Sequence, residues 1–179
     1  MTATIRPARP GDAAALAAVA AVTFPLACPP HTTPEAKADF IATVLSPERF
    51  AEYVADPSRI LLIAEDETGA AIGYTMVVLG EPADDDVRQA ISVRPTAELS
   101  KCYVLPGHHG EGVAARLMTA SVQAAADAGA DGMWLGVNEE NARAQRFYAK
   151  HGFERVGSKR FLVGERWEDD WVMERGSVA

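Results

Sequence analysis

Cysteine is scarce in this sequence, with two residues, Cys28 and Cys102, among 179. They stand far apart in unlike contexts, so their spacing indicates neither a disulfide framework nor a zinc knuckle. Reduced thiols are the default state in the cytosol. The scarcity therefore argues against a small secreted domain held together by disulfides, and it predicts a cytoplasmic protein.

Basic residues are outnumbered by acidic ones. There are 17 lysines and arginines against 25 aspartates and glutamates, which gives a formal net charge of −8. A nucleic-acid partner requires a basic surface that can meet phosphate groups. The balance predicts no nucleic-acid partner and suits a soluble protein or a cationic substrate.

The sequence shows neither a signal-peptide pattern nor a long hydrophobic run. Its N-terminus does not show the basic-then-apolar order of a signal peptide. The longest apolar stretch, Ala13–Leu26, is mostly alanine and short for a bilayer-spanning helix. We expect no membrane partner. No internal repeat, low-complexity tract or linker is present, so residues 1–179 are predicted to form one domain.

Strands and helices alternate in the second half of the chain, which favours an α/β layer with a mixed sheet. Three helix starts carry local signals: Asp12, Thr33 followed by Pro34, and Ser46 followed by Pro47. The other expected elements are a strand near Ile5, a hairpin around 66–69, a stretch with little structure over 81–94, a strand over 97–105, a helix over 110–128, a strand over 132–137, a helix over 139–151 and a strand pair over 152–175.

The stretch HHGEGVAARLM, His108–Met118, places two glycines at the start of the expected helix. The first helical turn has unpaired N–H groups, and residues with little or no side chain let a phosphate approach them. Gly110, Gly112, Ala114 and Ala115 therefore suit a pyrophosphate. The P-loop pattern is absent, because neither Lys-Ser nor Lys-Thr follows Gly112. The pattern G-x-G-x-x-A is met, but a dinucleotide fold needs more parallel β-α-β units, and a plain tight turn is the other alternative.

Two motifs in order identify a family resemblance. His109-Gly110-Glu111-Gly112-Val113-Ala114 resembles the [QR]-x-x-G-x-[GA] acyl-CoA loop of the GNAT superfamily of acetyl-CoA-dependent N-acetyltransferases. The segment NARAQRFYAKHGF, 141–153, resembles that family's N-x-x-A-x-x-[FL]-Y-x-x-x-G-F motif. The opening IRPARPGDAAAL resembles its first strand and helix, so the likeness covers nearly the whole chain. It implies one domain with a mixed, mostly antiparallel sheet flanked by helices.

The resemblance implies acetyl-CoA as co-substrate. Backbone groups of the strand before the loop would pair with the pantetheine arm, backbone amides of the loop would hold the pyrophosphate, and Asn141 would hydrogen-bond the arm. The implied cofactor-binding residues are Tyr103, Val104, Leu105, His109, Gly110, Glu111, Gly112, Val113, Ala114, Ala115, Asn141, Ala144 and Tyr148. His109 departs from the family, which usually has Arg or Gln there, so the cofactor affinity is expected to depend on pH. Arg143 and Arg146 can reach phosphate or form a solvated helix face.

Acetyl transfer needs an acid for the leaving thiolate and a base for the amine. Tyr148 matches the family's general acid; its alternative role is packing beside Phe147. Glu98, on the strand that leads into the loop, is the candidate base, and a surface glutamate is the alternative. Strict alternation would put Glu98 on one side with Cys102, away from Lys101. Cys102 itself has no histidine or aspartate placed to activate it, so we do not expect a thiol nucleophile.

No metal is expected, because the adjacent pair His108-His109 cannot share one helix face. The acceptor is an amine that the sequence does not identify. The segments 23–54, 134–137 and 166–173 resemble the bacterial spermidine/spermine acetyltransferase branch, and acidic runs at 84–86 and 168–170 suit a polyamine unless they are solvated turns. Amino acids, antibiotics and protein N-termini are other acceptors, and a non-catalytic acyl-CoA sensor is a rival function. The oligomeric state is not fixed by the sequence, and a homodimer is one alternative.

Overall fold

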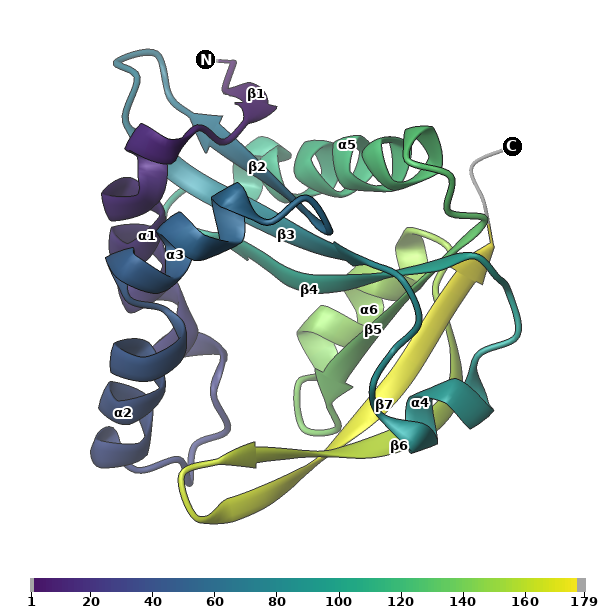
Figure 1. Ribbon diagram of the computed structural model, residues 1–179. Helices are drawn as coiled ribbons and strands as arrows, with labels where there is room; N and C mark the ends of the chain where they lie inside the picture. The colour runs from purple at the N-terminus through teal and green to yellow at the C-terminus, as the bar shows by residue number, and fades with distance from the viewer. Residues whose placement is uncertain (1, 177–179) are drawn as a thin grey trace.

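The fold is described from a computed structural model that covers residues 2–176, with Phe161 described by its backbone alone. One mixed sheet with strand order β1-β2-β3-β4-β5-β7-β6 runs through the molecule (Figure 1). Its strands are β1 (Thr4–Pro7), β2 (Arg59–Glu65), β3 (Ala71–Leu79), β4 (Thr96–Val104), β5 (Gly132–Asn138), β6 (Glu154–Val163) and β7 (Arg166–Gly176). All neighbours are antiparallel except β4 and β5, which confirms the expected mixed, mostly antiparallel sheet.

Helices cover both faces of the sheet (Figure 1). They are α1 (Ala13–Ala27), α2 (Pro34–Val44), α3 (Pro47–Ala55), α4 (Asp85–Ala90), α5 (Val113–Asp127) and α6 (Ala142–Lys150), with 3-10 turns η1 (Pro10–Asp12) and η2 (His109–Glu111). α1 and α3 pack with Tyr74 and Met76 of β3 in one core cluster. α5 packs with Val77 and Leu99 on the opposite face. The two cores hold β3 and β4 rigidly between them.

α1 is a core helix. Together with η1 it forms an 18-residue run, Pro10–Ala27, that is long enough, and apolar enough on average, to cross a membrane by length and composition alone. The stretch Ala13–Leu26 by itself was expected to be too short for this, and η1 extends it. Its Leu16, Val19 and Phe24 are buried against the sheet. This packing accounts for its hydrophobicity.

Two of the three expected helix caps are confirmed. The Thr33 hydroxyl accepts from the Ala36 amide at 3.1 Å and the Ser46 hydroxyl accepts from the Arg49 amide at 3.2 Å. Asp12 precedes α1 but does not cap it with its side chain. Its carboxylate is 2.8 Å from the guanidinium of Arg6, because a cation beside it outcompetes the helix amides.

The expectation of little structure over 81–94 was wrong. α4 forms there, with the Asp84 carboxylate accepting from the amides of Asp86 and Val87. Val87 and Ile91 are buried beside Trp134 and Val172. A good N-cap, an acidic first turn that suits the helix dipole and two buried apolar residues stabilise this short helix.

Candidate active site

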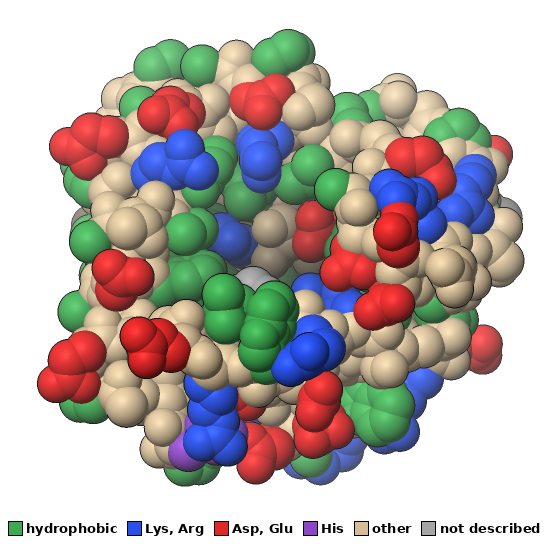
Figure 2. Space-filling model, turned by 60° about the horizontal axis from the view of Figure 1, so that its bottom comes forward, with side chains coloured by type: hydrophobic (Ala, Val, Ile, Leu, Met, Phe, Trp, Pro, Cys, Tyr) green, Lys and Arg blue, Asp and Glu red, His purple; other side chains and the backbone are tan. Residues whose placement is uncertain are grey.

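β4 and β5 pair over a short length and then part. Their parallel register joins Thr96–Glu98 to Gly132–Trp134 and extends no further. A cavity of about 530 Å³ lies beyond this point. Its walls come from α1, α2, β4, β5, α6, β6 and β7, so segments distant in the sequence meet in it. The face turned forward in Figure 2 is hollowed at its centre, with acidic and basic side chains among hydrophobic ones.

Tyr148 of α6 lines this cavity together with Asn141 and Ala144. Its ring packs edge-on against Phe147 at 5.6 Å and against Phe153 at 6.1 Å between centroids. Burial raises the pKa of its phenol well above the ordinary value. The hydroxyl has no hydrogen-bond partner within residues 2–176. Tyr148 is therefore held by packing, and it remains a proton donor at neutral pH.

Glu98 also lines the cavity, but the side chains that share its face of β4 differ from those that strict alternation predicted. A β-bulge interrupts the register: Lys101 pairs with Met76 and Leu99 pairs with the next residue, Val77, which leaves Ser100 as an extra residue. Glu98 therefore shares a face with Lys101 and Tyr103, not with Cys102 and Val104. The expected grouping of side chains was wrong because a single bulge reverses every later position.

The bulge brings Lys101 into the site, a residue that the sequence analysis did not single out. Lys101 is partly buried and lines the cavity. Burial lowers its pKa to about 8, although the nearby Glu98 carboxylate works in the opposite direction. Burial likewise raises the pKa of Glu98, which the neighbouring lysines partly counteract. No pattern in the sequence marked the bulge that places these two groups together.

The other charged groups of the cavity form pairs. Asp170 lies 3.8 Å from the ammonium of Lys159, and burial raises the pKa of Asp170 to about 6. Lys159 enters over Gly136, where a Cβ atom would come within 2.7 Å of its Cε. The Glu168 carboxylate is 2.5 Å from Nε2 of His31. Asp170 thus has the ammonium of Lys159 beside it, and Glu168 has the imidazole of His31.

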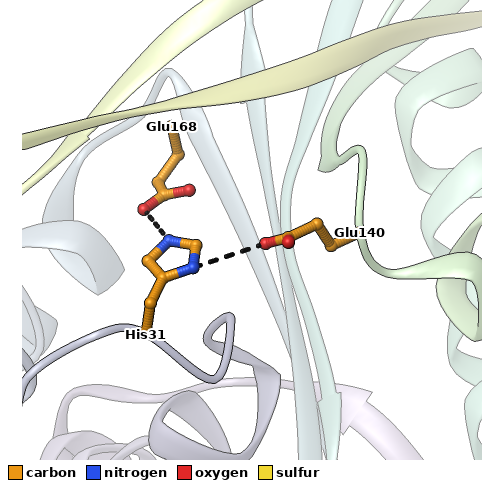
Figure 3. Close-up of side chains that lie close together, drawn as sticks. All are labelled: His31, Glu140 and Glu168. Atoms are coloured by element: carbon orange, nitrogen blue, oxygen red, sulfur yellow. Dashed lines mark hydrogen bonds and ion pairs between the residues drawn. The ribbon is translucent and has the colours of Figure 1, made fainter.

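His31 links three segments at the rim of the cavity. It lies between α1 and α2, while Glu168 belongs to β7 and Glu140 to the turn before α6. Figure 3 shows the imidazole between the two carboxylates, with Nε2 toward Glu168 and Nδ1 toward Glu140, the latter at 3.7 Å. Opposite ring nitrogens face the two carboxylates, so a metal bound to either nitrogen would have one of these carboxylates beside it. The imidazole therefore bridges the two carboxylates, and the expectation of no metal stays a prediction.

The glycine loop forms the end of the site beside α5. The helix starts at Val113, later than expected, because η2 occupies His109–Glu111. Gly112 has a φ of +73°, which favours glycine, and a Cβ atom added at either Gly110 or Gly112 would meet nothing within 4 Å. Open space thus lies over the unpaired amides of the first turn, Val113, Ala114 and Ala115, as an anion site requires.

His109 joins this loop to its surroundings. Its Nε2 lies 2.8 Å from the carbonyl oxygen of Val104, and Nη2 of Arg143 lies 3.3 Å from its Nδ1. The carbonyl can only accept and the guanidinium can only donate, so these contacts fit a neutral imidazole protonated on Nε2. His109 therefore holds the cation of Arg143 at the loop, whereas Glu111 pairs with His108 at 2.9 Å.

The backbone of β4 offers fewer groups to a ligand than expected. The Leu105 amide donates to Ile72 at 2.8 Å and its carbonyl accepts from the amide of His108, so both groups are occupied. Because backbone groups alternate sides along an antiparallel strand, Tyr103 also points toward β3. Val104 alone of the three faces the gap beside β5. The prediction of pairing through Tyr103 and Leu105 was wrong for this geometric reason.

Two further residues are constrained by their own contacts. Asn141 caps α6, with Oδ1 accepting from the Ala144 amide at 3.1 Å, so its Nδ2 group is the one that can reach a ligand. Burial raises the pKa of Cys102 to about 12, which keeps its thiol protonated and agrees with excluding it as a nucleophile. The acidic run 84–86 belongs to α4 and is not part of the cavity lining.

Comparisons with known proteins agree with this geometry. Residues 24–153 match the model of the Acetyltransferase (GNAT) family. A Mycobacterium tuberculosis protein named as an uncharacterized N-acetyltransferase is 50% identical over 167 residues, which cover 93% of this chain and 99% of the relative.

Solved structures show the same fold. PaiA N-acetyltransferase from Thermoplasma acidophilum in complex with coenzyme A has a TM-score of 0.77 at 19% identity, covering 98% of this chain and 99% of the other. A spermidine N-acetyltransferase SpeG chimera from Vibrio cholerae and hSSAT has a TM-score of 0.68 at 18% identity, covering 98% and 96%. By its sequence match, and with a fold and a cofactor loop that agree, this chain belongs to the GNAT family of acetyltransferases.

Proposed function

We propose that the protein transfers the acetyl group of acetyl-CoA to a primary amine by direct attack. The observation that carries the proposal is a single cavity that has Glu98 and Tyr148 in its lining and opens where β4 parts from β5. A carboxyl group with a raised pKa and a phenol that stays protonated are the acid–base pair that this reaction needs.

The open space over Gly110 and Gly112 supports a pyrophosphate at the start of α5. The helix dipole and the unpaired first-turn amides favour an anion there. Arg143, oriented by His109, adds the positive charge that an arginine at position 109 would supply. The Nδ2 group of Asn141 would hold the pantetheine arm, and the Val104 amide would meet the acetyl carbonyl.

The chemistry balances with these groups. Glu98 takes a proton from the ammonium, directly or through water, and the freed nitrogen attacks the thioester carbonyl. The Val104 amide, which faces the gap, polarises that carbonyl as the C–N bond forms. The C–S bond then breaks, and Tyr148 gives its proton to the leaving sulfur. The second proton that the attacking nitrogen loses passes through water to the tyrosinate, and the first proton leaves Glu98 to solvent.

The test combines binding with turnover. Thiol release from acetyl-CoA is followed over a panel of amines, and CoA binding is measured by calorimetry on the same preparation. We expect CoA binding and amine-dependent thiol release. A protein that binds CoA but releases no thiol with any amine would be an acyl-CoA sensor, the rival function.

The acceptor is the finer question. Spermidine and spermine remain predicted acceptors, and the carboxylates of Glu98, Glu168 and Asp170 in the cavity support a cationic one. Lys101 and Lys159 in the same cavity are unfavourable for a chain with several ammonium groups. Cytoplasmic location is proposed on the scarcity of cysteine.

A further inference from the structure

The charged groups that line the cavity differ in whether they have partners. Asp170 pairs with Lys159, and Glu168 pairs with His31. Glu98 and Lys101 have no hydrogen bond or ion pair of 4.0 Å or less within the part of the chain that the structure describes. One acid and one base are therefore left to meet a ligand.

Of these two groups, the ammonium of Lys101 is the less favourable one to leave without a partner. Lys101 is partly buried, and an ammonium group with reduced access to water and no paired carboxylate is unfavourable, so structural lysines avoid this position unless something compensates it. The nearby Arg59 adds to the cost, because its positive charge lowers the pKa of Lys101 further. An anion supplied by a ligand would complete this wall of the cavity.

Glu98 and Lys101 are neighbours on one face of β4. Their partners on β3, Val78 and Met76, are two residues apart, so the two side chains start about 7 Å from one another along the strand. An amino acid, whose ammonium and carboxylate are separated by one carbon atom, can meet both groups within that span. A linear polyamine can meet Glu98 but would bring a second cation against Lys101.

We propose that the acceptor is a small amino acid with an apolar side chain, whose amine meets Glu98 and whose carboxylate is bound by Lys101. This inference rests on the proposed function and names its substrate class. The rest of the cavity supports the apolar side chain, because Phe24, Phe40, Val44, Leu45 and Val163 line it. The Lys159–Asp170 pair lies on the β6–β7 side of the cavity, and the proposed binding of the amino acid does not require it.

The first experiment measures turnover with matched acceptors. Leucine, methionine and phenylalanine are each compared with their carboxamides, with spermidine as a further arm. We expect kcat/KM to be at least 10-fold higher for the acids, and Lys101→Met to abolish that preference mainly through KM. Lys101→Arg keeps the charge and should keep much of the preference. Equal or better use of the amides or of spermidine by the wild type would overturn the proposal.

The second experiment does not depend on turnover. N-acetylleucine and N-acetylleucinamide, the corresponding products, are titrated into the CoA-saturated protein by calorimetry. We expect the acid to bind at least 10-fold more tightly than the amide, and Lys101→Met to remove the difference. Equal affinities of the wild type for the acid and the amide would contradict the amino-acid assignment even if acetyl transfer occurs. A difference without any turnover would support the Lys101 site while contradicting the proposed catalysis.

Discussion

The two ends of the active site, the glycine loop and the cavity, are built in different ways. At the cofactor end, backbone amides of a short contiguous segment, residues 109–115, border open space, and the contact of Arg143 with His109 adds a cation. At the acceptor end, side chains from β4, β6, β7 and the loop between α1 and α2 create the charges. The first kind of site is determined by local sequence, whereas the second depends on how distant segments pack. The predictions below break one end and leave the other intact.

The largest effect is expected where the two ends meet. Tyr148→Phe keeps the ring packed against Phe147 and Phe153, but it removes the proton for the leaving sulfur. We expect kcat to fall by about 10²- to 10⁴-fold, with CoA affinity and thermal stability nearly unchanged. Steady-state kinetics at saturating amine measure this. An unchanged kcat would reduce Tyr148 to a packing residue.

A larger side chain in the glycine loop should weaken CoA binding and leave the acceptor end unchanged. Gly110→Val places a branched side chain in open space at a position without positive φ, so the fold should tolerate it. We expect CoA affinity to fall by about 10- to 100-fold, the loss of one or two charge-assisted hydrogen bonds. Calorimetry checks this.

Gly112→Val is the matched comparison, because its φ of +73° adds backbone strain to the same obstruction. Thermal unfolding should separate the two variants, with Gly112→Val less stable. Wild-type CoA affinity in Gly110→Val would mean that the loop does not hold the pyrophosphate.

Replacing Lys101, the unpaired cation of the cavity, should stabilise the folded protein. Lys101→Met is expected to raise the free energy of unfolding by about 1–3 kcal/mol at pH 7. The pKa of Lys101 is about 8 in the folded protein and 10.5 when exposed, so the folded state disfavours its charge. The gain should be complete below pH 8 and disappear as pH rises toward 10.5. Denaturant unfolding at several pH values measures it, and a destabilised variant at pH 7 would contradict it.

The smallest effect concerns the acidic run that lies outside the cavity. Asp84→Ala removes the cap of α4 and should cost about 1 kcal/mol of stability. Asp85→Asn with Asp86→Asn should leave KM unchanged for every acceptor, spermidine included. A rise in KM for spermidine alone would mean that Asp85 and Asp86 take part in binding a polyamine acceptor.

The same contrast explains what the sequence could predict. The glycine loop, the helix with Asn141 and Tyr148, and the mixed sheet follow local patterns or a family motif, and the structure has them. The face of β4 that carries Glu98 was misjudged, because the bulge at Ser100 depends on pairing with β3 and has no local signal. His31 and Glu168 are separated by 137 positions, so only the packed structure joins them.

The central claim is that Glu98 deprotonates the acceptor amine inside the cavity. The direct measurement is the pH profile of kcat/KM for wild type and Glu98→Gln. The acceptor used is an amine with no other charged group, and its amine pKa lies above about 9. For the wild type we predict a rise through the raised pKa of Glu98 and then a plateau, because the enzyme accepts the ammonium form. For Glu98→Gln we predict a rate lower by about 10²- to 10⁴-fold that keeps climbing to the pKa of the amine. Two parallel profiles that both climb to the pKa of the amine would contradict the account.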